Sequence, residues 1–181
     1  TTVNEASAVT TRQRAVAPTG FEVRLQEEEA ADGVHAAESV GWVAISVGNG
    51  QTAGRHFEAR RTADAVSHDW YDVTFAQPFA SAPVFLAALQ TFDGPDTTTT
   101  RSRGLTAGGV QLFAEEETSF DTESYHTAEV VGLLAIEAGD LQANTPPVAL
   151  DQDVATTQDT PVTITLAAED AEGDALTFAI E

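Results

Sequence analysis

The chain contains no cysteine and no methionine among its 181 residues. Without cysteine, the protein can form no disulfide bond, no thiolate metal site and no cysteine nucleophile. Without methionine, the chain has no initiator residue of its own, so we expect it to be processed or to be a segment of a longer protein. No apolar run reaches the roughly 18 residues that a transmembrane helix requires, so we expect no membrane insertion.

Positive charge is scarce as well. The chain has 29 acidic residues, 8 arginines and no lysine, which gives a net charge of −21. Nucleic acids and anionic membranes attract positive groups, so this composition argues against both as partners. Carboxylate oxygens are the ligands that calcium prefers, which leaves divalent cations and neutral ligands such as sugars as natural partners. A solvated, highly charged surface that keeps the protein soluble is the alternative interpretation.

Helix signals are weak, because no sustained i, i+3, i+4 pattern of apolar residues exists. The apolar residues instead form short runs bounded by proline, glycine and aspartate, which is typical of strands. With 42% hydrophobic residues a core can form, so we predict an all-β fold of antiparallel β-sandwich units in tandem. The predicted strands of the second unit cover 57–61, 70–79, 84–91, 101–105, 110–114 and 130–136.

One stretch occurs twice in the chain. Each copy has an acidic cluster, then His-x-x-Glu, then an apolar valine–glycine run that includes Ala-Ile and ends near a glycine. Such self-similarity indicates that one structural unit is used twice, together with whatever its acidic–histidine segment does. The matched residues are Thr2 and Thr91, Asn4 and Asp93, Arg12 and Arg101, Arg14 and Arg103, Gly20 and Gly109, His35 and His126, and Glu38 and Glu129.

The two copies are unequal in length. Residues 1–48 match only the C-terminal half of residues 56–140, so we expect a half unit, a linker at 49–55 and a complete second unit. Since a sandwich needs both faces, the half unit should be the less stable one. Its last strand, 40–45, is apolar on both faces, which indicates a covered outer face and places Trp42 in a core or an interface.

The composition changes at 141–147, where two prolines predict a stiff spacer. Beyond it, 148–150, 161–166 and 175–180 are predicted strands separated by acidic turns. The segment 148–181 is too short for a sandwich of around 100 residues, so we expect a truncated second type of sandwich that forms a hairpin or a loosely held tail.

The acidic segments are the first candidate sites. Closely spaced carboxylates repel one another and favour a bound cation, and calcium accepts six to eight oxygen ligands. The alternative is a solvated rim that hydrogen-bonds the backbone at the strand end. The candidate metal ligands are Glu116, Glu117, Asp121 and Glu123, with Asp170 and Asp174 in a turn of the tail.

The arginines form a second candidate set. Arg12 and Arg14, like Arg101 and Arg103, are two residues apart and would share one face of a strand. They can pair with the chain's own glutamates through charge-assisted hydrogen bonds, or they can contact a ligand.

The His-x-x-Glu motifs, His35 with Glu38 and His126 with Glu129, are a third candidate set. On a helix the two side chains would share a face and could share a zinc ion, but these motifs precede strands. A hydrogen bond to a neighbouring loop and a contact with a sugar hydroxyl are the remaining interpretations.

Patterns of a catalytic centre are absent from the sequence. It has no nucleophile elbow, no glycine-rich phosphate loop and no histidine pair with metalloprotease spacing. Two carboxylates can perform glycoside hydrolysis, but among 29 acidic residues such a pair arises by chance. We therefore expect a protein that is not an enzyme.

One set of motifs carries a family resemblance: Asp93 after a strand, the arginine strand, the final Ala135-Ile136, and Trp70-x-x-Val73-Thr-Phe75-x-x-Pro78-Phe79-x-x-x-Pro83-Val84. By these motifs residues 56–140, and 1–48 in half form, resemble the H-type lectin domain. Such domains are six-stranded antiparallel sandwiches, often trimeric, that bind sugars, commonly of galactosamine type. With this resemblance, the candidate ligand contacts are Asp93, Arg101, Arg103, Tyr125, His126 and Glu129, and Arg12, Arg14, His35 and Glu38 in the first copy.

The tail contains the motifs Asn144-Thr-Pro-Pro-Val-Ala149, Gln158-Asp-Thr-Pro-Val-Thr163 and Asp170-Ala-Glu-Gly-Asp174-Ala-Leu-Thr177. By these motifs it resembles bacterial cadherin-like and immunoglobulin-like repeats, which are strung along large secreted adhesins, often with calcium at their junctions.

Taken together, these features predict a secreted or cell-surface adhesion module that binds a glycan or polysaccharide, with calcium as a stabiliser. The first alternative is a structural spacer of a surface adhesin whose acidic loops bind calcium to stiffen the protein. The second is an accessory module of a polysaccharide-degrading enzyme.

Overall fold

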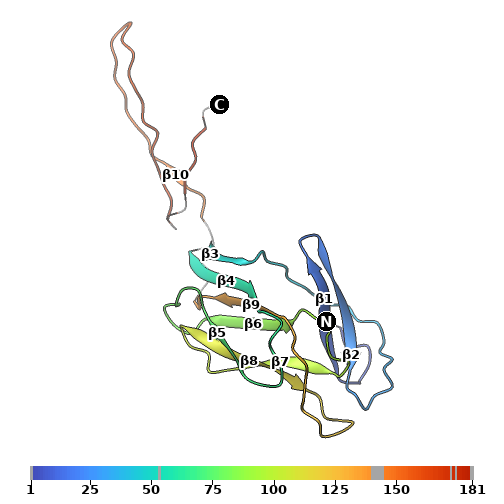
Figure 1. The fold of residues 1–181 in the computed structure, drawn as a ribbon. Coiled ribbons are helices and arrows are strands. Elements are labelled where there is room, and N and C mark those ends of the chain that lie inside the picture. Colours follow the sequence, from blue (N-terminus) through green and yellow to red (C-terminus); the bar gives the residue numbers. More distant parts are fainter. Residues whose placement is uncertain (1, 53, 140–144, 172, 174, 180–181) are drawn as a thin grey trace. The chain divides into compact units, whose positions relative to one another are not determined.

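The structure is a computed structural model that describes residues 2–52, 54–139, 145–171, 173 and 175–179. Within these ranges the chain forms strands and loops and no helix, so the predicted all-β class is confirmed. None of the described residues belongs to a helix of the length and apolarity that crossing a bilayer requires. The chain divides into two compact units, Thr1–Ala138 and Gly139–Glu181 (Figure 1).

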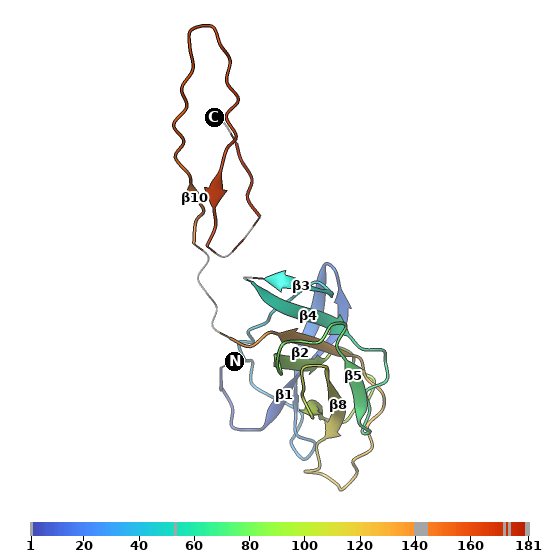
Figure 2. The same cartoon turned by 90° about the vertical axis from the view of Figure 1, so that its left-hand side faces the viewer.

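The larger unit contains a sandwich of two antiparallel sheets. Figure 2 shows strands β3 and β4 of one sheet in a separate layer from β5 and β8 of the other. The predicted strands of residues 56–140 are all present, with shifted ends. In sheet order, the strands are β3 (Gly48–Thr52), β4 (Arg55–Arg61), β9 (Val131–Ile136) and β6 (Val84–Leu89), and β5 (Tyr71–Thr74), β8 (Gly109–Glu116) and β7 (Thr98–Arg103).

Alternation of side chains along the strands builds the core between the sheets. In β8 every second residue is buried, including Val110 and Leu112, and in β9 the same period buries Val131 and Leu133. Successive side chains of a strand point to opposite faces, so this period places one apolar face of each sheet inward. Each fully buried aliphatic side chain stabilises the fold by about 1.5–3 kcal/mol.

A separate hairpin precedes the sandwich. It consists of β1 (Val9–Ala17) and β2 (Gly20–Glu27), which pair antiparallel with Val9 opposite Glu27. The hairpin of β7 and β8 has the same register, with Thr98 opposite Glu116 at the matched positions. The duplicated sequences therefore fold alike in this part, as the repeat predicts.

The predicted last strand of the first copy, 40–45, is wrong. These residues form no strand, and Trp42 is 68% exposed, with its ring edge against Phe21. The matched strand β9 is held by β4 on one side and β6 on the other. Among the described residues no strand lies beside 40–45, so its backbone lacks the partners that make a strand, and Trp42 lies in no core.

The segment 49–55, predicted as a linker, also differs. It contains most of β3 and the first residue of β4, which pair with each other in register from Gly48 opposite Ala59 to Thr52 opposite Arg55. Gly48–Thr52 has no apolar alternation, and only backbone pairing at the sheet edge makes it a strand. The two predicted units, 1–48 and 56–140, consequently belong to one compact unit.

The smaller unit has one short antiparallel ladder, β10 (Val148–Ala149) with β11 (Ala168–Glu169). This pairing agrees with the expected hairpin, but the strand predicted at 161–166 is absent, and so is that at 175–180 as far as residue 179. Val162, Ile164 and Leu166 are exposed, because the described part of this unit offers no second layer to cover them. Asp170 lies at a turn, whereas Asp174 is outside the described residues.

Candidate functional site at the junction of the two copies

The end of the β1–β2 hairpin packs against loops of the second copy. The backbone N–H of Thr97 donates to the Glu29 carboxylate at 3.2 Å, and the backbone N–H of Glu29 donates to Glu117 at 2.8 Å. The Gln26 amide donates to the carbonyl oxygen of Pro95 at 2.8 Å. These bonds join residues that are far apart in the sequence, so they define a junction between the two copies.

Arg12 is the centre of this junction. Its Nη2 donates to Oε1 of Glu129 at 2.6 Å, and the two side chains are 1% and 0% exposed. Its Nη1 donates to the Gln26 side chain at 3.0 Å and to the Asp96 carbonyl oxygen at 3.3 Å, and its guanidinium lies 4.7 Å from the centre of the Phe92 ring. Burial lowers the pKa of Arg12, and the negative charge of Glu129 opposes that change. Arg12 thus reaches from the first copy into the second.

Glu129 accepts hydrogen bonds from several groups besides Arg12. The Thr91 hydroxyl lies at 2.5 Å, the Asp93 backbone N–H at 3.2 Å and Nε2 of His126 at 3.1 Å. Burial alone would raise the pKa of this carboxyl group. The bonds from His126 and Thr91 and the charge of Arg12 outweigh burial and lower the pKa of Glu129 to about 2. The carboxylate is therefore ionised and fully satisfied inside the protein.

His126 lies between two glutamates. Its Nε2 is 3.1 Å from Glu129 and its Nδ1 is 3.6 Å from Oε2 of Glu116. The ring is buried and packs directly on Gly94, where a Cβ would lie 2.6 Å from the imidazole. The His-x-x-Glu motif is thus an internal network, with no exposed sugar-binding edge.

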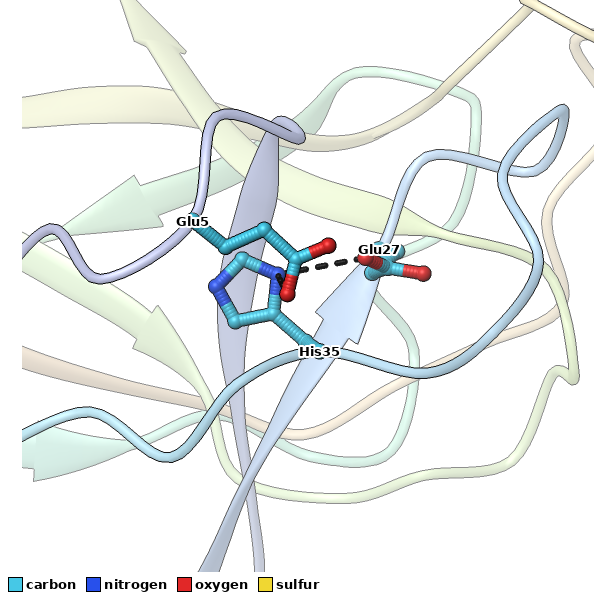
Figure 3. A group of neighbouring side chains, drawn as sticks. All are labelled: Glu5, Glu27 and His35. Carbon is cyan, nitrogen blue, oxygen red and sulfur yellow. Dashed lines mark hydrogen bonds and ion pairs between the residues drawn. The ribbon is translucent and has the colours of Figure 1, made fainter.

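The same Glu–His–Glu arrangement recurs in the first copy, and Figure 3 shows its His35 and Glu27 together with Glu5. Nδ1 of His35 lies 3.1 Å from Glu27, and its Nε2 lies 3.5 Å from Glu38. These two glutamates match Glu116 and Glu129, which face the same two ring nitrogens of His126. Glu5 approaches Nδ1 to 3.9 Å. Burial by itself would lower the pKa of His35. The bonds and charges of Glu27, Glu5 and Glu38 outweigh burial and raise that pKa.

The surroundings of Glu38 repeat those of Glu129 with one difference. Glu38 accepts the Thr2 hydroxyl and, at 2.5 Å, the Asn4 backbone N–H, which match Thr91 and Asp93. In the part of the chain that the structure describes, no arginine reaches Glu38. Both copies therefore contain the acceptor glutamate, but only the glutamate of the second copy, Glu129, is bonded to an arginine.

Three carboxylates meet at the junction. Glu29, Asp96 and Glu116 each place an oxygen within 4.8 Å of the others, and Glu5, Glu27 and His35 form a second such group. Burial raises the pKa of Glu116 to about 7. His126 opposes this increase, whereas the charges of Asp96 and Glu29 add to it. Cation-binding chemistry is possible at both groups, because carboxylate oxygens are ligands for hard cations.

The predicted metal ligands are only partly brought together. Glu116 belongs to the junction group, but Glu117 bonds Ser119 and the Glu29 backbone instead. Asp121 and Glu123 are exposed, and Asp121 accepts the Glu123 backbone N–H in a local turn. Among the described residues, neither joins a group of ligand atoms within 4.8 Å.

The other three arginines of the candidate set, Arg14, Arg101 and Arg103, are exposed and have local partners. Nε of Arg14 lies 2.6 Å from Glu22, and Nε of Arg101 lies 2.6 Å from Glu115. With the pair of Arg12 and Glu129, three of the four predicted arginines form ion pairs with the chain's own glutamates. Arg103 instead donates to Gln111 at 2.8 Å.

The aromatic residues near the predicted ligand site pack against other side chains. Trp70 is covered by the Arg103 guanidinium at 3.8 Å and packs on Phe113 at 4.3 Å. Tyr125 is exposed and stacks on His68 at 4.4 Å. The side chain of Asp93 faces solvent, and only its backbone enters the Glu129 network.

A groove of about 920 Å³ runs along the junction. Arg24, Glu27, His35 and Asp96 line it, together with Phe120, which is 75% exposed. Sequence reasoning missed Glu27, Glu29 and Asp96 as site residues. The repeat alignment identifies Glu27 as the partner of Glu116, but only folding brings Glu29 and Asp96 beside them.

No family model matches the chain, and no solved structure matches it significantly. Over 140 residues, 76% of this chain, it is 31% identical to Halomucin of Haloquadratum walsbyi (strain DSM 16790 / HBSQ001). The chain spans about 2% of the length of that protein. The resemblances to H-type lectin and cadherin-like domains stay predictions.

Proposed function

We propose that the chain is a non-catalytic structural module of a repetitive extracellular surface protein in which each copy docks onto the next. The similarity to Halomucin is compatible with an extracellular surface module. The observation that carries the proposal is the buried pair of Arg12 in the first copy and Glu129 in the second. The same burial argues against sugar contacts at Arg12, His126 and Glu129, because a ligand cannot reach them.

The docking surface of the first copy recurs on the second. Arg101 matches Arg12, and it is held by Glu115 as Arg12 is held by Gln26, but its side chain is 59% exposed. At the other end, Glu38 has the hydrogen-bonding surroundings of Glu129 without its arginine, and because its side chain is 3% exposed, docking has to open a path to it. A donor surface and an acceptor surface on one molecule give a head-to-tail contact, which forms rings or open chains of molecules.

The test is self-association of the chain, measured by sedimentation velocity over a concentration series. High salt is needed, because a net charge of −21 causes strong repulsion that salt screens, whereas a buried pair is screened less. We expect concentration-dependent association that Arg101→Ala and Glu38→Gln each weaken. Arg103→Ala, an exposed change on the same strand, is the matched control.

A charge exchange makes the test specific. Chains with Arg101→Glu and chains with Glu38→Arg should not associate alone, and a mixture of the two should associate again. A chain that stays monomeric up to high concentration, or that associates equally well with Arg101→Ala, would contradict the proposal.

Carbohydrate binding is the second candidate, and Phe120 is the observation in its favour. An exposed aromatic side chain in a groove that also contains Arg24 and Asp121 combines a stacking surface with polar groups that can orient a sugar. A glycan array, read with and without calcium, tests this function. Binding should disappear with Phe120→Ala and persist with Tyr125→Ala, and absence of binding to any glycan would argue against it.

A further inference from the structure

The carboxylate group at the junction is built from both copies. Glu29 comes from the loop after β2, Asp96 from the loop before β7, and Glu116 from the end of β8. The backbone N–H of Thr97 donates to Glu29 at 3.2 Å and orients that carboxylate beside Asp96. The group therefore exists only while the two copies are docked.

Among the described residues, no N–H group donates to the Glu116 side chain, whose carboxyl group faces that of Asp96. The Glu116 side chain is 3% exposed, and its Oε2 is buried without a hydrogen-bond partner. Nδ1 of His126 lies 3.6 Å from that oxygen, beyond the range of a good hydrogen bond. A buried carboxylate that faces two others is costly when it is ionised, and either a proton, as the raised pKa of Glu116 reflects, or a bound cation relieves that cost.

The first copy provides a comparison. Its matched glutamate, Glu27, has His35 at 3.1 Å, and Ser7 occupies the position that matches Asp96. Its neighbouring group contains a histidine and two glutamates. Within the described ranges, a group made of carboxylates alone occurs only around Glu116.

We propose that Glu29, Asp96 and Glu116 bind one divalent cation of the calcium type, which joins the two copies. Calcium binds oxygen at about 2.3–2.6 Å, so two oxygens on opposite sides of one ion are about 5 Å apart. Carboxylate oxygens within 4.8 Å of one another fit that geometry. An all-oxygen ligand set favours calcium or magnesium over zinc, and solvent on the open side supplies the remaining ligands.

The experiment is calorimetric titration of the chain with calcium chloride and, separately, magnesium chloride in 1 M potassium chloride. At this ionic strength the screening length is about 3 Å, so diffuse attraction to the acidic surface is suppressed and coordination remains. We expect one saturable site, at least tenfold weaker binding with Asp96→Asn or Glu29→Gln, and a calcium-dependent rise in melting temperature that both variants lose.

Glu123→Gln is the matched control, because it removes an exposed acidic charge outside the group, and binding should be unchanged. Near-ultraviolet circular dichroism verifies that each variant is folded. Absence of saturable binding, or equal binding by wild type and both folded variants, would overturn the inference. Calcium binding by a monomeric chain would contradict the proposed head-to-tail docking alone, and association without calcium binding would contradict this inference alone.

Discussion

Replacement of Arg12 by alanine tests the junction most directly. The change removes the guanidinium from Glu129, whose side chain is 0% exposed, and leaves that carboxylate buried. Removal of one partner of a buried ion pair costs about 3–5 kcal/mol. Glu129 keeps its bonds from Thr91, Asp93 and His126, so we expect a loss of about 3 kcal/mol, at the lower end of that range.

Arg14→Ala is the control for this change. Arg14 lies two residues further along the same strand and pairs with Glu22, but both side chains are exposed. Surface pairs contribute about 0–1 kcal/mol, because water screens them and their side chains lose freedom on pairing. The two variants therefore remove the same side chain from one strand and differ in burial.

Urea unfolding at constant salt measures both variants. With a slope of about 2 kcal/mol per M, a loss of 3 kcal/mol lowers the midpoint by about 1.5 M for Arg12→Ala, whereas Arg14→Ala should lower it by less than about 0.5 M. Hydrogen exchange should show faster exchange of the β1 and β2 amides in the Arg12 variant. Equal midpoints for the two variants would refute the claim that the Arg12–Glu129 pair holds the copies together.

Three further changes test the network and the core. Gly94→Ala places a Cβ 2.6 Å from the His126 ring and should cost about 1–3 kcal/mol in a thermal or urea melt, whereas Gly108→Ala meets open space and should change little. A pKa of about 2 for Glu129 in the folded state, against 4.5 as its ordinary value, corresponds to roughly 3 kcal/mol of stability. This contribution is present above about pH 4.5 and is lost as the pH falls from there through 2. Leu112→Ala removes a fully buried side chain and should cost about 2–5 kcal/mol by urea titration.

Each of these has a result that would contradict it. Equal melting of the Gly94 and Gly108 variants would show that the imidazole ring has room to move. If Glu129→Gln left the fall in stability between pH 4.5 and 2 unchanged, another carboxylate would be responsible for it. A Leu112 variant as stable as wild type would place that side chain outside the core.

Much of the larger unit could be predicted from the sequence. Alternating apolar residues identify β8, and the continuous apolar run bounded by Pro83 identifies β6, because the strand period alone determines which side chains face a core. The repeat also predicts that β1 and β2 pair as β7 and β8 do, and their registers agree. Local pattern was sufficient for these strands, whose pairing partners are among the described residues.

The errors have a common cause. Residues 40–45 have a strand-like sequence, yet β9 is a strand because β4 and β6 pair with it, and 40–45 has no such neighbours among the described residues. Gly48–Thr52 has no strand-like pattern, yet it pairs with β4. Hydrogen bonding to a neighbouring strand determines whether each segment is a strand. The composition of one segment does not reveal which neighbour it has in the folded chain.

The sequence by itself determined the class of the fold, the duplication, and the residue types at the site: the acidic charge, the arginines and the two His-x-x-Glu motifs. Only the tertiary structure decided which of them meet. Arg12 contacts Glu129, which is 117 residues away, and Glu29 joins Asp96 and Glu116 across the two copies. The physical reason is that charge and side-chain period are local properties, whereas burial and ion pairing depend on which distant surfaces the folded chain removes from water together.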